Sequence, residues 1–164
     1  MPAEGAEPAG MRSHVTFKTP RFNQTEVQPH FINPCCFGED CIFWLIGELR
    51  ERGWADLTDP WQEDWGWQTS GQRDGWRYLL SVGLIPEDTP EWLAHIHERP
   101  PLLERLRGRG ELVVLPRLAP ALHQVLRAAP DISDVRWHFE GVFRRGGSDG
   151  AVDPSAPRSA GETG

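Results

Sequence analysis

A predicted amphipathic helix between Glu39 and Gly53 constrains the fold of this 164-residue chain more than any other segment. Its large apolar side chains recur at spacings of three and four residues: Ile42, Leu45, Ile46 and Leu49. This period places them on one face of an α-helix, and the acidic residues at its start suit the helix dipole. Phe43 and Trp44 widen the apolar face, so we expect other parts of the chain to cover this helix on more than one side.

The segments around this helix alternate between apolar and polar residues, as strands do. The alternation predicts strands at 14–19, 64–69, 76–83, 92–98 and 134–142. Turn-forming residues at 70–75 predict a hairpin between the second and third of these strands. Further helices are expected at 101–107 and 118–129. The order predicts an α+β fold, with an antiparallel or mixed sheet of about five strands and two to three helices packed mainly on one face.

The two ends of the chain differ in composition from its centre. Residues 1–13 and 144–164 are rich in Gly, Pro, Ala and Ser and nearly lack large apolar side chains. Such segments cannot bury enough surface to order themselves, so we expect disordered tails there. The remainder, 14–143, is long enough for one domain with one hydrophobic core.

The formal net charge of −7 argues against nucleic acid as a partner, because phosphate contacts need Lys and Arg. The charges are also segregated along the chain. Eight acidic residues lie between positions 39 and 64: Glu39, Asp40, Glu48, Glu51, Asp56, Asp59, Glu63 and Asp64. Six arginines lie between 99 and 127. The predicted domain is therefore two-sided in charge, which can steer a partner, and two ordinary solvated faces are the alternative.

Three cysteines fall within seven residues, at positions 35, 36 and 41. An odd number at this spacing is not a disulfide framework, which favours a reducing cytoplasm. No run approaches the ~18 apolar residues of a membrane span, and the N-terminus lacks a secretory signal pattern. We therefore expect a cytoplasmic protein that does not enter a membrane.

Cys35 and Cys36 precede the predicted helix, where the helix dipole could lower a thiol pKa. That dipole equals only about half a positive charge, and Glu39 and Asp40 oppose it. The favoured interpretation is small, buried, reduced cysteines where a loop meets a helix.

The alternative is a metal- or thiol-dependent enzyme, in which Cys35 or Cys36 joins His95 and His97 around zinc. His30 and Cys41 are further ligand candidates, but no C-x₂-C pair exists. Otherwise no cofactor is expected.

A segment rich in tryptophan and carboxylates lies at 59–67, in a chain with eight tryptophans. Aromatic anchors flanked by acids are typical of a binding site for a protein with a basic or amphipathic surface, or for a cationic ligand. The candidate binding residues are Trp61, Glu63, Asp64, Trp65 and Trp67, together with Asp40. The alternative is that Trp65 and Trp67 share one strand face and pack on the helix.

Catalytic motifs are missing from the sequence. It has no G-x-S-x-G, no phosphate-binding glycine loop and no H-E-x-x-H. Glu63 and Asp64 are adjacent in sequence, which does not suit a facing pair of glycosidase carboxylates.

The strings PHFINPCCFGED (29–40) and QEDWGW (62–67) resemble those of a group of small uncharacterised bacterial proteins. The resemblance implies no activity, but it marks two segments that could form a single surface at one end of the sheet. The leading hypothesis is a non-catalytic cytoplasmic protein-binding module, immunity-like or an adaptor. Besides the enzyme, a small-ligand sensor that uses the tryptophan surface is the other alternative.

Overall fold

A computed structural model describes residues 12–86, 90–106, 118–146 and 150–157. The strands are β1 (His14–Lys18), β2 (Trp61–Glu63), β3 (Gly66–Arg73), β4 (Trp76–Ile85), β5 (Glu91–Arg99) and β6 (Ser133–His138). The helices are α1 (Glu39–Glu51), α2 (Leu102–Leu106), α3 (Leu118–Ala128) and α4 (Glu140–Arg144). Within these residues no helix is both long and apolar enough to cross a bilayer.

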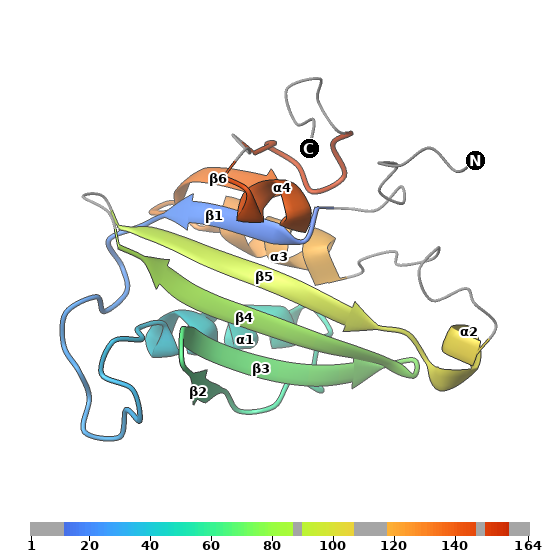
Figure 1. Cartoon of the computed structure of the whole chain (residues 1–164), viewed down its shortest axis with the longest axis horizontal. Coiled ribbons are helices and arrows are strands. Elements are labelled where there is room, and N and C mark those ends of the chain that lie inside the picture. The colour runs from blue at the N-terminus through green and yellow to red at the C-terminus, as the bar shows by residue number, and fades with distance from the viewer. Residues whose placement is uncertain (1–11, 87–89, 107–117, 147–149, 158–164) are drawn as a thin grey trace.

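The strands form one antiparallel sheet in the order β2-β3-β4-β5-β1-β6 (Figure 1). The N-terminal strand β1 therefore lies between two strands that come much later in the chain. The predicted α+β class is confirmed, with six strands in place of about five. The additional strand is β2, which precedes the strand predicted at 64–69 and pairs with the start of β3, and β3 itself begins at Gly66.

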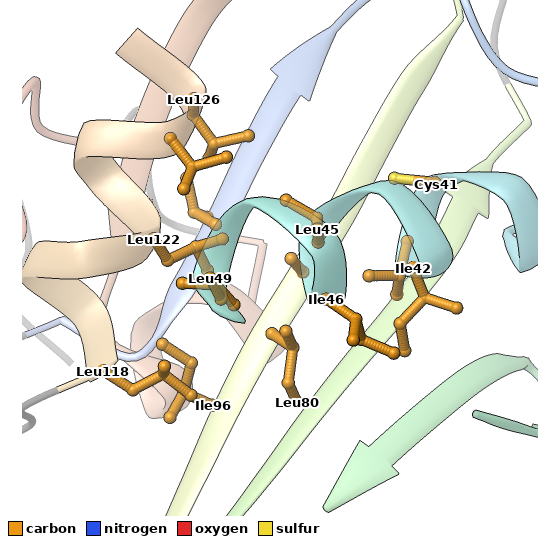
Figure 2. Packing of buried hydrophobic residues seen from close by; sticks show 14 of the residues in the cluster. Cys41, Ile42, Leu45, Ile46, Leu49, Leu80, Ile96, Leu118, Leu122 and Leu126 are labelled. Atoms are coloured by element: carbon orange, nitrogen blue, oxygen red, sulfur yellow. The ribbon is translucent and has the colours of Figure 1, made fainter. Parts of the chain in front are cut away.

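Helices α1 and α3 pack side by side on one face of the sheet (Figures 1 and 2). The predicted apolar face of α1 is confirmed, since its four aliphatic residues at 42, 45, 46 and 49 are at most 2% exposed. Alternate strand residues meet them from the sheet, among them Leu80 and Ile96. Figure 2 shows Leu118, Leu122 and Leu126 of α3 completing this core. Most of the buried apolar side chains thus lie between these helices and one sheet face.

The described residues cover the opposite face of the sheet only in part. Helix α4 lies over β1 and β6 on that side (Figure 1), where the ring of Phe143 contacts His14 and His138. The last strand was predicted to extend over 134–142, and this is wrong. The strand stops at His138 and the chain turns into α4, because Val142 and Phe143 fold back onto the sheet instead of alternating along it.

The hairpin between β3 and β4 is tighter than the predicted turn at 70–75. The strands continue to Arg73 and from Trp76, which leaves Asp74 and Gly75 as a two-residue turn. Both have positive φ, 52° and 80°, as a type I′ turn requires. The Asp-Gly pair therefore defines the turn, and its polar neighbours belong to the strands.

Parts of the segments predicted as tails pack on the domain. Arg12 is 1% exposed, and its guanidinium donates hydrogen bonds to the carbonyl oxygens of Trp137, Ala156 and Pro157. Ala151 exchanges two backbone hydrogen bonds with Trp137, at 2.7 and 2.8 Å. A buried guanidinium needs such acceptors, and the segment 150–157 supplies two of the three.

Gly66 lies where the β2–β3 turn presses onto β4, which generates a stability prediction. A Cβ at Gly66 would lie 2.1 Å from the backbone oxygen of Val82, so one of the two strands would have to move. Gly66→Ala should lower the free energy of unfolding by about 3 kcal/mol, measured by urea denaturation. The matched control is Gly47→Ala on the exposed side of α1, where a Cβ meets nothing within 4 Å. It should raise stability by about 0.5–1 kcal/mol. Equal stability of the two variants would contradict this account.

Candidate functional site

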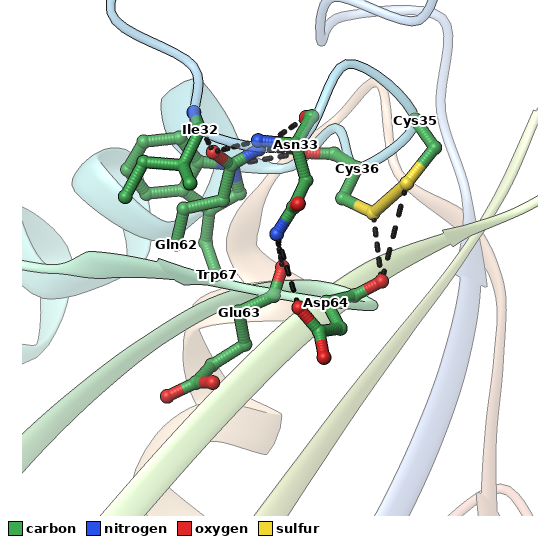
Figure 3. The surroundings of a disulfide bond; sticks show 8 residues. All are labelled: Ile32, Asn33, Cys35, Cys36, Gln62, Glu63, Asp64 and Trp67. Atoms are coloured by element: carbon green, nitrogen blue, oxygen red, sulfur yellow. Dashed lines mark hydrogen bonds between the residues drawn. A yellow bond between two sulfur atoms is a disulfide. The ribbon is translucent and has the colours of Figure 1, made fainter.

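The two marked sequence strings meet beside the start of α1 (Figure 3). The side-chain amide of Gln62 joins them. Its oxygen accepts hydrogen bonds from the backbone N–H groups of Ile32 and Asn33 at 2.6 and 3.0 Å, and its nitrogen donates to the carbonyls of Asn33 and Cys36. The indole N–H of Trp67 donates to the same Cys36 carbonyl at 2.9 Å. The contacts satisfy the amide fully, so this junction holds the loop before α1 onto the sheet.

Trp65 and Trp67 do not share a strand face, so the packing alternative is wrong for Trp65, and the prediction of Trp67 as a binding residue is wrong because Trp67 belongs to the core. Trp67 is 5% exposed and packs in the core against Phe31. Trp65 is 45% exposed and lies over Gly83 on the opposite face, with its ring 5.3 Å from that of His95. The physical reason is the turn between β2 and β3, which includes Trp65 and interrupts the alternation.

The other candidate binding residues lie in two places. Trp61 is 37% exposed at the sheet edge, and its indole N–H donates to the Glu63 carboxylate at 2.6 Å. Asp64 is exposed in the following turn and accepts from the Asn33 amide at 3.2 Å. Asp40 lies apart from them, where it accepts the backbone N–H of Asn23 at 2.8 Å. Trp61 and Glu63 are therefore in contact at the sheet edge and Asp64 and Trp65 follow them in the turn, whereas Asp40 and Trp67 contribute to other parts of the structure.

Cys35 and Cys36 form a disulfide, so the prediction that both are reduced is wrong. The Cys36 sulfur lies 2.9 Å from the backbone oxygen of Asp64 (Figure 3). Cys41 is a buried free thiol, and burial raises its pKa, with the nearby Asp40 adding to the effect. The odd number of cysteines and their close spacing argued against a disulfide framework, but they do not exclude one bond between neighbouring cysteines. A disulfide is uncommon in a reducing cytoplasm, and the cytoplasmic location stays a prediction.

The proposed metal ligands are not assembled into one cluster. His95 and His97 are two residues apart on β5 and both point to the sheet face opposite α1, while Cys35 and Cys36 are bonded to each other. The described residues contain no group of three or more His, Cys, Asp or Glu side chains able to hold a metal ion. In this oxidised state the two cysteines offer no thiolate, which is the form that binds zinc.

One row of side chains crosses the open face of the sheet from edge to edge. Its members are directly paired across neighbouring strands: Trp61, Gln68, Ser81, His95, His14 and His138. Because side chains alternate along a strand, the row points away from α1 and α3. Helix α4 covers the end with His14 and His138, and the end with Trp61 stays open.

The covered end of this row is a cluster of histidines. His14 is 7% exposed, and its ring stacks on that of His95 with centroids 5.1 Å apart. Burial lowers the pKa of His14 to about 4, and the neighbouring His95, Arg144 and His138 act in the same direction. Burial also lowers the pKa of His95, against an opposing effect of Glu140. These two histidines are therefore neutral at pH 7.

The open end of the face holds a cavity of about 790 Å³. Its lining includes Trp61, Ser70, Arg77, Leu79, His97 and Arg99. The sheet register explains the grouping, since Ser70, Leu79 and His97 form one cross-strand row and Arg77 faces Arg99 in the next. Sequence reasoning identified only Trp61 and His97. The positions of the predicted strand 76–83 that point away from the core include Arg77 and Leu79, and this signal could have found them. Ser70 and Arg99 lie outside the predicted strands.

Comparisons of the chain with known protein families, with curated proteins and with solved structures find no match. The fold and this site define an α+β domain with one half-open sheet face. The open half carries the exposed tryptophans, the Glu63 carboxylate bound to Trp61, and the cavity.

The histidine cluster predicts that stability falls in mild acid. The pKa of His14 is about 6.5 in an unfolded chain and about 4 in the folded one, so the unfolded chain binds the proton more tightly. The contribution of His14 is complete above pH 6.5 and is lost as the pH falls toward 4, about 3 kcal/mol in total. Urea denaturation between pH 7.5 and 4.5 measures this. His14→Gln should show a shallower pH slope than wild type, whatever its stability at pH 7.5, and an unchanged slope would refute the assignment.

The disulfide predicts a thiol count. Labelling of the denatured, unreduced protein with iodoacetamide should modify one cysteine, Cys41, and labelling after reduction should modify three, as mass spectrometry can resolve. In Cys36→Ser the unreduced protein should take up two labels, because Cys35 loses its partner. Three labels on unreduced wild-type protein would show that Cys35 and Cys36 are thiols.

Proposed function

We propose that this protein is a non-catalytic protein-binding module that uses the open face of its sheet. The proposal rests on one observation above all: Trp61 and Trp65 are exposed beside the carboxylates of Glu63 and Asp64. The partner is a protein with a basic or amphipathic surface. The protein acts in the cytoplasm, either as an immunity-like protein that neutralises a toxin or as an adaptor.

The two tryptophans supply the apolar part of such an interface. A large aromatic side chain that is more than a third exposed is a source of binding energy once a partner covers it, and tryptophan is enriched among residues that dominate interfaces. Trp65 lies over Gly83 and against His95, and Trp61 is held by Glu63. Because both side chains already have contacts in the free protein, less conformational entropy is lost on binding.

The two carboxylates supply the charge. One oxygen of Glu63 accepts the Trp61 indole N–H and one oxygen of Asp64 accepts the Asn33 amide. Each carboxylate has further lone pairs for a Lys or Arg of the partner. Charges at the border of an apolar contact speed association and select the partner, and salt weakens their effect. A basic segment with an apolar anchor therefore suits this end of the face.

The experiment is affinity capture from the host lysate with identification of a stoichiometric partner, followed by calorimetry of the purified pair. Trp65→Ala should weaken binding about 30-fold, as loss of a dominant interface tryptophan does, and Glu63→Gln should weaken it less and reduce its salt dependence. The matched control is Phe43→Ala, which removes an aromatic ring that is 50% exposed on α1, away from the sheet face.

Circular dichroism and thermal melts establish that the three variants are folded. A partner that binds Trp65→Ala as tightly as wild type, or that Phe43→Ala releases equally, would count against the proposed surface. The absence of any stoichiometric partner in its own host would count against the function itself.

A further inference from the structure

We infer that the cavity beside Trp61 is a binding site for a small organic anion, a carboxylate or phosphate attached to a flat apolar ring. This inference goes beyond the proposed protein-binding function and does not depend on it. The cavity lies on the same sheet face as Trp65. Its arginines are positively charged, whereas the carboxylates that border Trp65 are negatively charged.

Two arginines give the cavity its positive charge. Arg77 of β4 and Arg99 of β5 stand directly opposite each other in the sheet register. In the described part of the chain neither guanidinium has an ion-pair or hydrogen-bond partner. Like charges directly opposite on neighbouring strands destabilise a sheet. An anion bound between them would remove that repulsion, and guanidinium groups match carboxylate and phosphate oxygens with paired hydrogen bonds.

The remaining lining sets the kind of molecule that carries the anion. Leu79 is half-buried between Ser70 and His97 in its cross-strand row, and the indole of Trp61 stands at the sheet edge. This combination of an apolar floor, an aromatic side and a few polar groups is typical of small-molecule sites. The volume of about 790 Å³ also lies in the usual range for them. A flat ring can stack on Trp61 while its acidic group reaches the arginines.

The charge balance of the lining favours an anion over a cation. Asp56 is the acidic residue among the lining residues, against the guanidinium groups of Arg77 and Arg99. Glu63 and Asp64 lie outside the lining, beyond Trp61 along the chain. An organic anion is therefore attracted to the arginine end of the face and repelled from the carboxylate end.

Calorimetry with defined probes tests the site. The anionic probes are 1-naphthyl phosphate and 1-naphthoate, and the controls are 1-naphthol, which lacks the charge, and inorganic phosphate, which lacks the ring. At least one anionic probe should bind one to one, at least tenfold more tightly than either control. Binding of one probe alone identifies phosphate or carboxylate as the recognised group. In ¹⁵N spectra the indole signal of Trp61 should shift on binding.

Arg77→Gln and Arg99→Gln should each weaken the anionic probe about tenfold or more, the loss expected for one charge-assisted hydrogen bond. Arg73→Gln is the matched control, because Arg73 belongs to the same hairpin but stacks on Trp54 on the other face. Asp56→Asn should tighten binding. The inference is overturned if neither anion binds, if 1-naphthol binds equally well, or if both glutamine variants bind like wild type.

The outcome is separable from that of the proposed function. Trp65 and Glu63 are not part of the cavity lining, so Trp65→Ala should retain the anionic probe even where it loses a protein partner. Arg77→Gln should lose the anionic probe but retain a protein partner.

Discussion

The apolar contact between one face of the sheet and helices α1 and α3 is the interaction on which the rest of the structure depends. Both helices use the same face, and each fully buried aliphatic side chain there contributes about 1.5–3 kcal/mol. The other face is consequently left to residues that need not be apolar. Helix α4 covers only its β1–β6 part, so the half formed by β2 to β5 is where polar and aromatic side chains remain accessible.

Local patterns in the sequence predict much of this arrangement. The spacing of Ile42, Leu45, Ile46 and Leu49 predicts α1 and its buried side, and alternation predicts which residues of β4 and β5 face it. Strand order was beyond reach, because β1 pairs with residues about 80 and 120 positions away and no local pattern encodes such partners. The α4 turn was missed for a related reason, since Phe143 leaves the strand to contact His14, a residue at the other end of the chain.

The candidate site was also predicted only in part from the sequence. Trp61, Glu63 and Asp64 were found from composition, because aromatic and acidic residues are conspicuous together. Arg77 and Arg99 were not, because each is an ordinary exposed arginine until the register of β4 and β5 sets them opposite each other. The position of Trp65 depended on a turn at 64 and 65, where alternation predicted the first residues of a strand, and the Cys35–Cys36 bond depended on the backbone of a loop.

The central place of β1 in the sheet has a consequence for synthesis on the ribosome. Its two neighbours, β5 and β6, end at Arg99 and His138, and Arg12 just before it binds carbonyls at 156 and 157. Strand β1 therefore cannot form its hydrogen bonds with β5 until Arg99 has been synthesised, or those with β6 until His138 has been synthesised. Until then the apolar side chains of Val15 and Phe17 have no sheet to join. Before these partner strands are synthesised, β1 is an unpaired strand with exposed backbone hydrogen-bonding groups, which is a site for pairing with other chains.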